Sequence, residues 1–399
     1  MRMANFSDVA ELISGVTFKK ADSKSEKLPG TIGVLRAGNI QDSEVIMDDV
    51  VYVPDRFVKS SQQLKEGDIL IASSSGSLDV VGKAAAVPSN VNVAFGAFCK
   101  VARPKREVVF PAYFKHFFRS TGYKREVRER AEGANINNLN RGDFLSLQIP
   151  LPPLQEQKRI AGILDEADRV RKKTQTLIDK YDELAQSLFL DMFGDPVTNP
   201  KGWEVKPLGD VSILTTKGES PKWQGHSYSA EGVRFVTSEN VRMGFLNFPK
   251  EKFVPIKFHE KLKRSQLKQN DLLINLVGAS IGRGALVHED LLPANINQAV
   301  AKTELDIGQV EPDFILHQIL LPQVQSRLIQ SQVEGARANI SLKDIKEIRL
   351  IVPSLQLQNE FASRLKCVLE QRRMTASKMQ SMDDLFSALL QKAFKGELN

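Results

Sequence analysis

Two segments of the chain carry apolar residues at the spacing of a long amphipathic helix. In the first, from about residue 154 to 192, two rows of residues recur every seven positions, as in a heptad repeat. The rows are Ile160, Ala167, Thr174, Tyr181 and Leu188, and Ile163, Val170, Leu177 and Leu184. Gly194 and Pro196 are typical of a helix end, so the pattern predicts one helix that stops just before them.

The second segment, from about 355 to 394, repeats this pattern. Its rows are Phe361, Val368, Thr375, Met382 and Leu389, and Leu365, Met379, Phe386 and Ala393, with Arg372 as a polar member. Each helix would be roughly 55–60 Å long at ~1.5 Å per residue. A stripe this apolar needs a partner, and the most economical partner is the other segment, which predicts an antiparallel coiled coil. Two bundle helices in separate domains are the alternative.

Upstream of each long helix the pattern is mixed. Short apolar runs bounded by polar turns, at 68–72 and 234–237, are typical of strands. The segments 111–118 and 312–319 each begin with proline and continue with apolar residues, which predicts helices. We therefore expect domains of mixed α/β content with curved antiparallel sheets.

The chain repeats itself at an offset of about 200 residues. Residues 149–157 resemble 351–358, and residues 64–71 resemble 267–274. Further matches keep the same order, and Gly82-Lys83 answers to Gly282-Arg283. Matches in one order at nearly one offset indicate duplication of a unit that consists of a mixed domain and a helix.

The fold class that follows is α+β, with two pseudo-symmetric mixed α/β domains separated by two long antiparallel coiled-coil helices. The predicted boundaries are 1–150 for the first mixed domain, 151–200 for the first long helix, 201–352 for the second mixed domain and 353–399 for the second long helix.

Positive charge gathers in two stretches. The net charge is only +7, but residues 100–141 contain eleven Lys and Arg against four Asp and Glu, and residues 242–268 contain eight against two. Such stretches suit a polyanion such as nucleic acid. Two solvated helix or loop faces would give the same composition.

The cysteines and the apolar runs exclude several classes of protein. Cys99 and Cys367 are far apart in sequence, so they form no metal-ligand spacing and no disulfide framework. The N-terminus does not have the form of a signal peptide, and no apolar run approaches the roughly 18 residues that span a bilayer. We expect a cytoplasmic protein that does not contact a membrane.

No motif of a catalytic centre fits its context. Asp165-Glu166-Ala167-Asp168 spells a helicase box, but it lies inside the first predicted long helix. The spacing before Gly82-Lys83 is one residue too long for a Walker loop, and Ala84 occupies the place of the Mg²⁺-binding Ser or Thr. The histidines have no Cys or Glu at metal spacing. We expect no catalytic residue, no metal and no cofactor in this chain.

Several stretches resemble the type I restriction–modification specificity subunits. Residues 151–168, together with 189–195 (Phe-Leu-Asp-Met-Phe-Gly-Asp), are similar to the central conserved region of that family. Residues 203–211 resemble the opening of its target recognition domains, and 271–283 resemble a motif within those domains. The resemblance covers essentially the whole chain and its duplicated layout. The first copy lacks the Trp-led opening, so the pattern gives no support for its first strand.

The resemblance implies a non-catalytic DNA sequence-specificity subunit. Each target recognition domain would read one half of a bipartite target in double-stranded DNA, and the helices would set the spacing and dock two methyltransferase subunits. Restriction subunits with translocase activity would join the complex, and S-adenosylmethionine, Mg²⁺ and ATP would belong to those partners. The alternatives are a non-catalytic target-recognition subunit of another DNA-modifying system, and an unrecognised nuclease or methyltransferase.

Reading a half-site requires cations for phosphates and amide or hydroxyl groups for base edges. Lys83 and Arg283 follow glycine turns at equivalent places, so we expect both to contact phosphate. Loop-surface charge is the alternative. The other candidates are Asn135, Asn137, Asn138 and Arg141 in the first copy, and Lys217, Lys222, Ser280, Asn297, Gln298, Arg337, Asn339 and Lys343 in the second. Roles in turns and helix caps are the alternative for these residues.

Overall fold

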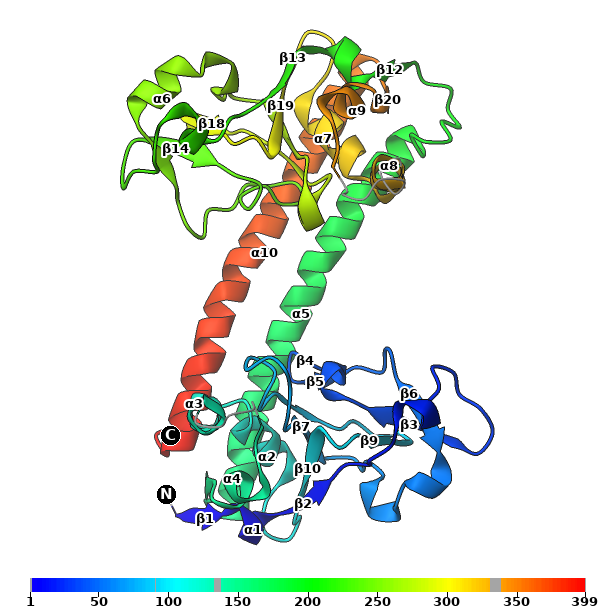
Figure 1. Ribbon diagram of the computed structural model, residues 1–399, viewed down its shortest axis with the longest axis vertical. Coiled ribbons are helices and arrows are strands. Elements are labelled where there is room, and N and C mark those ends of the chain that lie inside the picture. Colours follow the sequence, from blue (N-terminus) through cyan, green and yellow to red (C-terminus); the bar gives the residue numbers. More distant parts are fainter. Residues whose placement is uncertain (1, 90, 133–137, 331–338, 399) are drawn as a thin grey trace. The chain divides into compact units, whose positions relative to one another are not determined.

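The computed structural model describes residues 2–89, 91–132, 138–330 and 339–398 of the chain (Figure 1). Unit 1 comprises Met1–Thr176 and Ala376–Asn399, and unit 2 comprises Leu177–Thr375. The helices α5 (Leu154–Phe193) and α10 (Leu355–Lys395) therefore each contribute one part to unit 1 and the other part to unit 2. The boundaries expected from the sequence keep each helix whole and stay a prediction.

Unit 1 is built on a four-stranded antiparallel sheet of order β2-β10-β7-β8. A three-stranded sheet of order β6-β3-β9 accompanies it, and its β3–β9 pair is parallel. The expectation of purely antiparallel sheets is therefore wrong for this smaller sheet. The bounds are β2 (Ala10–Ser14), β3 (Thr31–Leu35), β6 (Val51–Pro54), β7 (Ile69–Ala72), β8 (Ala84–Ala86), β9 (Val93–Phe95) and β10 (Cys99–Pro104).

Unit 2 repeats both sheets in the same order. Its four-stranded sheet is β13-β19-β16-β17, and its three-stranded sheet is β15-β14-β18 with a parallel β14–β18 pair. This agreement confirms that the two halves of the chain are copies of one fold. The bounds are β13 (Ser212–Lys217), β14 (Val233–Val236), β15 (Phe253–Val254), β16 (Leu272–Asn275), β17 (Gly284–Leu286), β18 (Ala294–Ile296) and β19 (Val300–Leu305).

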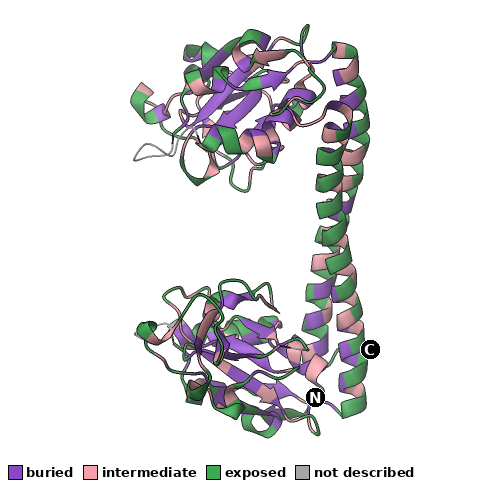
Figure 2. Ribbon diagram, turned by 90° about the vertical axis from the view of Figure 1, so that its right-hand side faces the viewer, coloured by how far each residue is buried: buried purple, intermediate pink, exposed green. Residues whose placement is uncertain are grey.

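Short helices and a two-stranded pair complete each unit. Buried residues gather on the strands and on the helices that cover them (Figure 2). In unit 1 these elements are α1 (Phe6–Val9), α2 (Pro111–Phe117), α3 (Thr121–Glu132) and α4 (Arg141–Leu145). In unit 2 they are α6 (Ile256–Lys261), α7 (Pro312–Leu320), α8 (Pro322–Gln330) and α9 (Leu342–Lys346). The two helices predicted to open with proline, α2 and α7, are confirmed.

A first strand is present in unit 1, although the sequence pattern did not support one. β1 (Met3–Asn5) pairs antiparallel with β11 (Gln148–Pro150), as β12 (Val205–Pro207) pairs with β20 (Arg349–Ile351) in unit 2. The pairing depends on backbone hydrogen bonds and on buried Ala4 and Ile149, so it does not require a tryptophan before the strand.

A buried glutamine ties the start of each long helix to its mixed domain. In unit 1 the Gln157 side chain donates to the Pro152 carbonyl (2.8 Å) and accepts from the Phe110 backbone N–H (2.8 Å). In unit 2 the Gln358 side chain donates to the Pro353 carbonyl (2.8 Å) and accepts from a backbone N–H at 2.9 Å. The repeated glutamine of the sequence motif therefore has a structural role, because its amide joins two segments at once.

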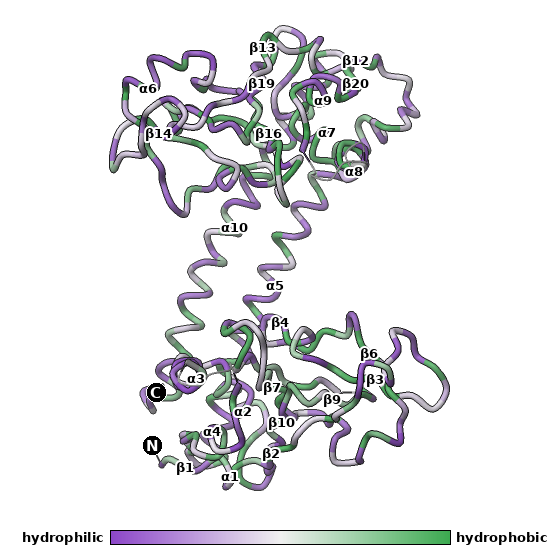
Figure 3. The backbone as a smooth tube through the Cα atoms, viewed as in Figure 1, coloured by the Kyte–Doolittle hydropathy of each residue, from purple (hydrophilic) through white to green (hydrophobic). Residues whose placement is uncertain are grey.

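The long helices run antiparallel where they meet inside unit 1. Arg171 Nε lies 2.6 Å from the Asp383 carboxylate, and the Thr174 hydroxyl lies 3.3 Å from Met382 Sδ. Towards the start of α5, Arg159 contacts the backbone of Leu398. One residue number falls as the other rises, which is the signature of an antiparallel pair. Hydrophilic and hydrophobic positions alternate along both helices (Figure 3).

The same direction holds inside unit 2. Arg372 Nε donates to the Asp182 carboxylate at 2.5 Å. Nearer the end of α5, Phe189 and Phe193 pack on Phe361 with ring centroids 5.5 and 5.6 Å apart. The helices are therefore partners of each other in both units, which favours the coiled coil over two separate bundle helices.

The burial pattern follows the predicted seam along α10 and is shifted from it by one residue in the middle of α5. Leu177 and Leu184 are 42% and 49% exposed, whereas the following residues Ile178 and Ala185 are buried. The true seam of α5 also holds Arg171 and Asp182, which make the ion pairs described above. The missed residues Ile178 and Ala185 are apolar, and both members of each adjacent pair are apolar, so the heptad count alone did not separate the buried residue from its exposed neighbour. The other predicted seam residues are buried or half-buried: Ile160, Ile163, Ala167, Val170, Tyr181 and Leu188 in α5, and Phe361, Leu365, Val368, Met379, Met382 and Leu389 in α10.

Candidate nucleic-acid interface

The loop that joins β7 to β8 in unit 1, residues 73–83, is fixed at its start by two other segments. Ser73 donates its backbone N–H to the Phe98 carbonyl (2.9 Å), and its hydroxyl donates to the same carbonyl (3.0 Å). Ser74 forms an antiparallel bridge with Asn138. The fold therefore brings the predicted residue Asn138 to the loop that ends in Lys83, although the two are far apart in sequence.

The same loop is fixed at its end by α3. Gly82 has a φ of +82°, and its carbonyl accepts a hydrogen bond from the Tyr123 hydroxyl (3.0 Å). A Cβ at this position would lie 2.2 Å from Val127 Cγ1, so only glycine allows the loop to pack directly on the helix. The next residue, Lys83, is exposed.

The corresponding loop of unit 2, residues 276–283, is fixed in the same two ways. At its start, Val277 forms an antiparallel bridge with Asn339. At its end, Gly282 has a φ of +79°, and its carbonyl accepts from Gln325 Nε2 (3.0 Å) on α8. The predicted equivalence of the two loops is confirmed, even though the residue that holds the glycine differs.

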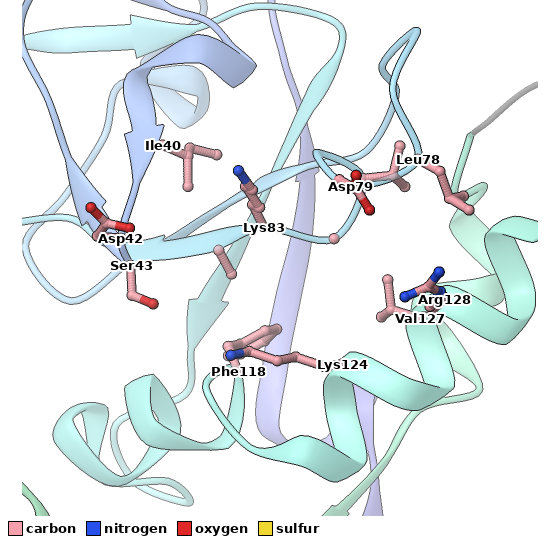
Figure 4. A pocket seen from close by; sticks show the side chains of 13 residues that line it. Ile40, Asp42, Ser43, Leu78, Asp79, Lys83, Phe118, Lys124, Val127 and Arg128 are labelled. Carbon is pink, nitrogen blue, oxygen red and sulfur yellow. The ribbon is translucent and has the colours of Figure 1, made fainter. Parts of the chain in front are cut away.

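A hollow of about 340 Å³ lies between the loop of unit 1, α3 and the hairpin that follows β3 (Figure 4). Lys83 reaches it from the loop, and Lys124 and Arg128 reach it from α3. Asp42 and Asp79 also line the wall. Cations outnumber carboxylates here, so the hollow suits a phosphate or a base edge better than a cationic ligand.

The hairpin beside this hollow differs in chemistry between the two copies. In unit 1 its tip joins β4 (Ile40–Gln41) to β5 (Glu44–Val45), and the tip residues 41–44 are Gln-Asp-Ser-Glu. In unit 2 the equivalent tip, 242–245, reads Arg-Met-Gly-Phe, and the Gly244 N–H donates to the Gly284 carbonyl (2.9 Å). One scaffold therefore presents an acidic tip in one copy, and a basic and apolar tip next to Arg283 in the other.

A second group of predicted residues meets at the turn between β18 and β19. Gly218, which follows Lys217, donates its N–H to the Asn297 carbonyl (3.2 Å). Lys217 and Lys222 are exposed, and Gln298 is half-buried. The Asn297 side chain accepts from the Ala299 N–H (3.1 Å), so it shapes the turn, as the alternative role for these residues anticipates.

The other predicted residues divide between local roles and open positions. Ser280 Oγ lies 3.5 Å from the carbonyl of Val277 in its own turn, and Lys343 lies 3.7 Å from Glu347 one helical turn along α9. Arg141 is exposed, with one guanidinium nitrogen 3.4 Å from the Leu12 carbonyl. Three predicted residues lie outside the described part of the chain: Asn135, Asn137 and Arg337.

Two separate stretches of the chain, residues 2–180 and 200–380, match one family model, the type I restriction modification DNA specificity domain. The chain belongs to this family. The specificity subunit of the type I restriction enzyme EcoKI from Escherichia coli strain K12 is 29% identical over 422 residues, covering 99% of this chain and 89% of the relative. The StySPI specificity subunit from Salmonella potsdam is 27% identical over 414 residues, covering 99% and 88%.

Solved structures of this family share the fold of the two DNA specificity domains. A chain described in a study of complex assembly and conformational transition of the type I R-M system aligns over 100% of this chain and 98% of its own, with a TM-score of 0.57 and 18% identity. The S subunit from M. genitalium aligns over 98% and 96%, with a TM-score of 0.54 and 15% identity. At these identities the likeness concerns the fold.

The sequence left several residues of the DNA specificity domains unnoticed. Phe98, whose carbonyl holds the start of the loop 73–83, is 70% exposed, and Lys124 and Arg128 line the hollow. Arg242 and Phe245 belong to the hairpin tip of the second copy. The basic stretches 100–141 and 242–268 contain most of these residues, but a charge count does not indicate which side chains face a common loop.

The described residues offer neither a metal cluster nor a membrane-spanning helix. No group of three or more His, Cys, Asp or Glu side chains within those residues is placed to hold a metal ion. None of the helices in the same ranges is both long enough and apolar enough to cross a membrane.

Proposed function

We propose that this chain is the DNA sequence-specificity subunit of a type I restriction–modification complex, and that each DNA specificity domain reads one half of a bipartite target. The observation that carries the proposal is the duplication itself. One domain occurs twice with the same anchored loop, while the hairpin tips beside that loop carry different side chains. A common scaffold with different loop chemistry is suited to reading two different short sequences.

The proposed contacts follow the chemistry of the loops. Lys83 and Arg283, each next to a glycine turn, contact phosphates and set the position of the domain on the duplex. The hairpin tips and the segments at Asn138 and Asn339 contact base edges, because amide, carboxylate and guanidinium groups distinguish base pairs in the major groove.

The proposal places the chemical steps on other subunits. Two methyltransferase subunits dock on this chain with S-adenosylmethionine, and restriction subunits with translocase activity bring Mg²⁺ and ATP. This chain has no catalytic role and binds no cofactor of its own. The names of the relatives, which are specificity subunits of type I restriction enzymes, support this division of work.

Methylome sequencing tests the proposal directly. The chain is expressed together with its methyltransferase partner in cells that lack other modification systems, and the methylated motifs are mapped. We expect one bipartite motif with a fixed gap, which disappears when the gene for this chain is deleted. Methylation that persists without this chain, or robust methylation or cleavage by the purified chain alone, would contradict the proposal.

A further inference from the structure

One aromatic side chain in each unit is far more exposed than the other aromatic residues described there. Phe98 is 70% exposed, the highest value for an aromatic residue in the described part of unit 1, and Trp223 is 76% exposed, the highest in the described part of unit 2. Isolated apolar residues are common on protein surfaces, so exposure alone does not identify a site. The way in which the backbone around each residue is fixed supplies the second observation.

Phe98, in the turn between β9 and β10, lies beside the start of the candidate loop 73–83. Its carbonyl accepts hydrogen bonds from the backbone N–H groups of Ser73 (2.9 Å) and Ser74 (3.1 Å) and from the Ser73 hydroxyl (3.0 Å). Ser74 in turn bridges Asn138. The backbone of Phe98 is therefore held next to the polar residues that we expect to contact DNA, while its ring faces solvent.

The equivalent turn of unit 2 carries no aromatic residue of its own. Ala299 takes the place of Phe98, and its carbonyl accepts from the Leu276 N–H (2.9 Å). Gly218 packs against this turn so closely that a Cβ would lie 1.8 Å from the Ile296 carbonyl oxygen. The short helix η6 (Pro221–Gln224), which carries Trp223, follows directly. Unit 2 thus carries its exposed aromatic residue on the segment that follows Gly218, and not on the turn itself.

The turn that carries Trp223 is itself well anchored. The Glu219 carboxylate accepts from the Gln224 side chain and lies 3.0 Å from an Arg264 guanidinium nitrogen. Pro221 is buried, and Gly225 ends the turn with a φ of +73°. The indole is therefore presented from a fixed backbone, so little conformational freedom is lost when it binds a ligand.

The charge around both aromatic residues favours nucleic acid over a protein partner. Lys222 is exposed next to Trp223, and Arg264 belongs to the basic stretch 242–268. In unit 1 the exposed Lys83 ends the loop that begins beside Phe98. Aromatic rings among cations match base faces among phosphates, whereas the core of a protein–protein interface is depleted of lysine.

We propose that Phe98 and Trp223 enter a groove of the duplex and stack on, or wedge between, bases, one residue in each half-site. This inference rests on the proposed function and deepens it. Because the two rings come from different segments of the repeated fold, the two half-sites are held by different apolar contacts. Aromatic and other apolar side chains are used in this way by proteins that partly unstack a base step.

Trp223 provides its own spectroscopic probe. The chain has two tryptophans, and the other one, Trp203, is half-buried with its indole N–H donated to the Phe193 carbonyl (2.9 Å). We expect the indole emission of the full chain to fall when a short duplex with the mapped target is added, and to change much less with a scrambled duplex. In Trp223→Phe the remaining emission, from Trp203, should not respond to either duplex.

Alanine variants measure the contribution to affinity. We expect Phe98→Ala and Trp223→Ala each to weaken binding of the target duplex by about 5- to 100-fold, with the salt dependence of binding unchanged. Trp223→Phe should retain most of the affinity because a stacking ring remains. Leu28→Ala and Ile213→Ala are matched controls, since these side chains are 47% and 67% exposed in unit 1 and unit 2 and belong to neither site. Thermal unfolding should be unchanged in all five variants.

The outcomes separate this inference from the proposed function. If the full chain binds its mapped duplex but the alanine variants bind equally well and Trp223 emission does not respond, the inference is wrong and the proposed function stands. Loss of methyltransferase binding with unchanged DNA affinity would instead assign the aromatic residues to a protein interface and overturn the inference. If no motif is mapped and no duplex is bound, the proposed function itself fails.

Discussion

Lys83 and Arg283 occupy equivalent positions in the two copies of the fold but carry different cationic groups. Each follows a glycine with positive φ and precedes the strand that completes the four-stranded sheet, β8 or β17. A lysine offers a point charge, whereas a guanidinium offers a planar fork that binds a phosphate or a guanine with two hydrogen bonds. We therefore expect the two domains to hold DNA with unequal strength at this position.

Removal of either cation should reduce the salt dependence of DNA binding. For Lys83→Ala and Arg283→Ala we expect weaker binding of the mapped duplex, and a slope of log affinity against log salt that is smaller by about one unit for each lost phosphate contact. Fluorescence anisotropy over a range of salt concentrations measures both quantities. Lys173→Ala, at an exposed position of α5, is the control. An unchanged slope would show that the cation does not contact phosphate.

The segment Asp165-Glu166-Ala167-Asp168, whose sequence matches a helicase motif, has a structural role. Asp165 accepts hydrogen bonds from Lys115 Nζ (2.6 Å) and His116 Nε2 (2.8 Å), and an Arg119 guanidinium nitrogen lies 2.7 Å from Asp168. Partial burial opposes ionisation of Asp165, but these hydrogen bonds and charges outweigh it and lower its pKa to about 2. The carboxylates therefore attach the first mixed domain to α5.

Mild acid should destabilise this attachment. Burial lowers the pKa of His116 below 6.5, although its hydrogen bond to Asp165 acts in the opposite direction. In the unfolded chain this imidazole takes up a proton as the pH falls through about 6.5, while in the folded chain it stays neutral to lower pH. The unfolded state then binds more protons, so stability is complete above pH 6.5 and is lost as the pH falls towards the pKa of the folded state.

Urea unfolding between pH 8 and pH 5 checks this expectation. The midpoint for the full chain should fall with pH below about 6.5, and His116→Gln should show a flatter dependence. His317 in unit 2 also has a pKa lowered by burial, so some dependence should remain in that variant. His288→Gln, at an exposed position, should behave like the parent. A parent and a His116→Gln profile that run parallel would contradict this account.

At the scale of elements, α5 and α10 meet through a seam in which apolar and charged residues alternate. In unit 1, Phe386 of α10 lies between two guanidinium groups, with Arg119 at 4.6 Å and Arg171 at 4.7 Å from its ring centroid. In unit 2 the seam ends in an aromatic cluster where Phe314 and Phe193 are 4.9 Å apart. The attachment in unit 1 therefore adds an ionic network to packed rings, among them Tyr113 and Phe394 with centroids 5.2 Å apart, whereas the cluster in unit 2 is aromatic.

A matched pair of substitutions tests the register of α5. Ile178 is buried and its neighbour Leu177 is 42% exposed, so Ile178→Ala leaves a cavity and Leu177→Ala does not. We expect Ile178→Ala to lower the free energy of unfolding by about 2 kcal/mol or more, and Leu177→Ala to lower it by less than ~1 kcal/mol. Urea titration of the two variants measures the difference. The reverse order would support the heptad rows read from the sequence.

At the scale of the whole molecule, neither long helix belongs to one unit. Each compact unit takes one part of α5 and one part of α10, and the chain passes from one unit to the other inside continuous helices. A helix is stiff over this length, whereas a flexible linker of similar size would leave the domains free. We therefore expect the lengths of these helices to determine the gap between the two halves of the DNA target.

Inserted heptads test whether the lengths of the helices determine the gap between the half-sites. We add seven helix-forming residues after Thr176 in α5 and seven after Thr375 in α10, where the two units divide. A heptad keeps the seam facing its partner and adds about 10 Å, or roughly three base pairs of DNA. Methylome sequencing should find both half-sites unchanged and the gap longer. Insertion of two residues in each helix, which rotates the seam by about 200° away from its partner, is the control that should abolish methylation. An unchanged gap after heptad insertion would show that the helix lengths do not determine it.

The amino-acid sequence by itself determined the extents of the long helices, the duplication and the family. These features depend on short-range signals: the seven-residue period, the stop at Gly194 with a φ of +78°, and the repeated glutamine motif at Gln157 and Gln358. The period and the stop are set by local backbone geometry, and the glutamine motif is recognised as a repeated run of residues, so no knowledge of distant contacts is needed to predict these features.

Only the tertiary structure decided which loop residues lie together and which face of α5 is the seam. The Phe98 carbonyl meets Ser73, and Asn138 meets Ser74, because sheet pairing brings distant segments side by side. Asp182 belongs in the seam because Arg372 of the other helix compensates its charge. Such positions depend on a partner that is remote in sequence, and the polarity of a residue alone does not reveal whether that partner exists.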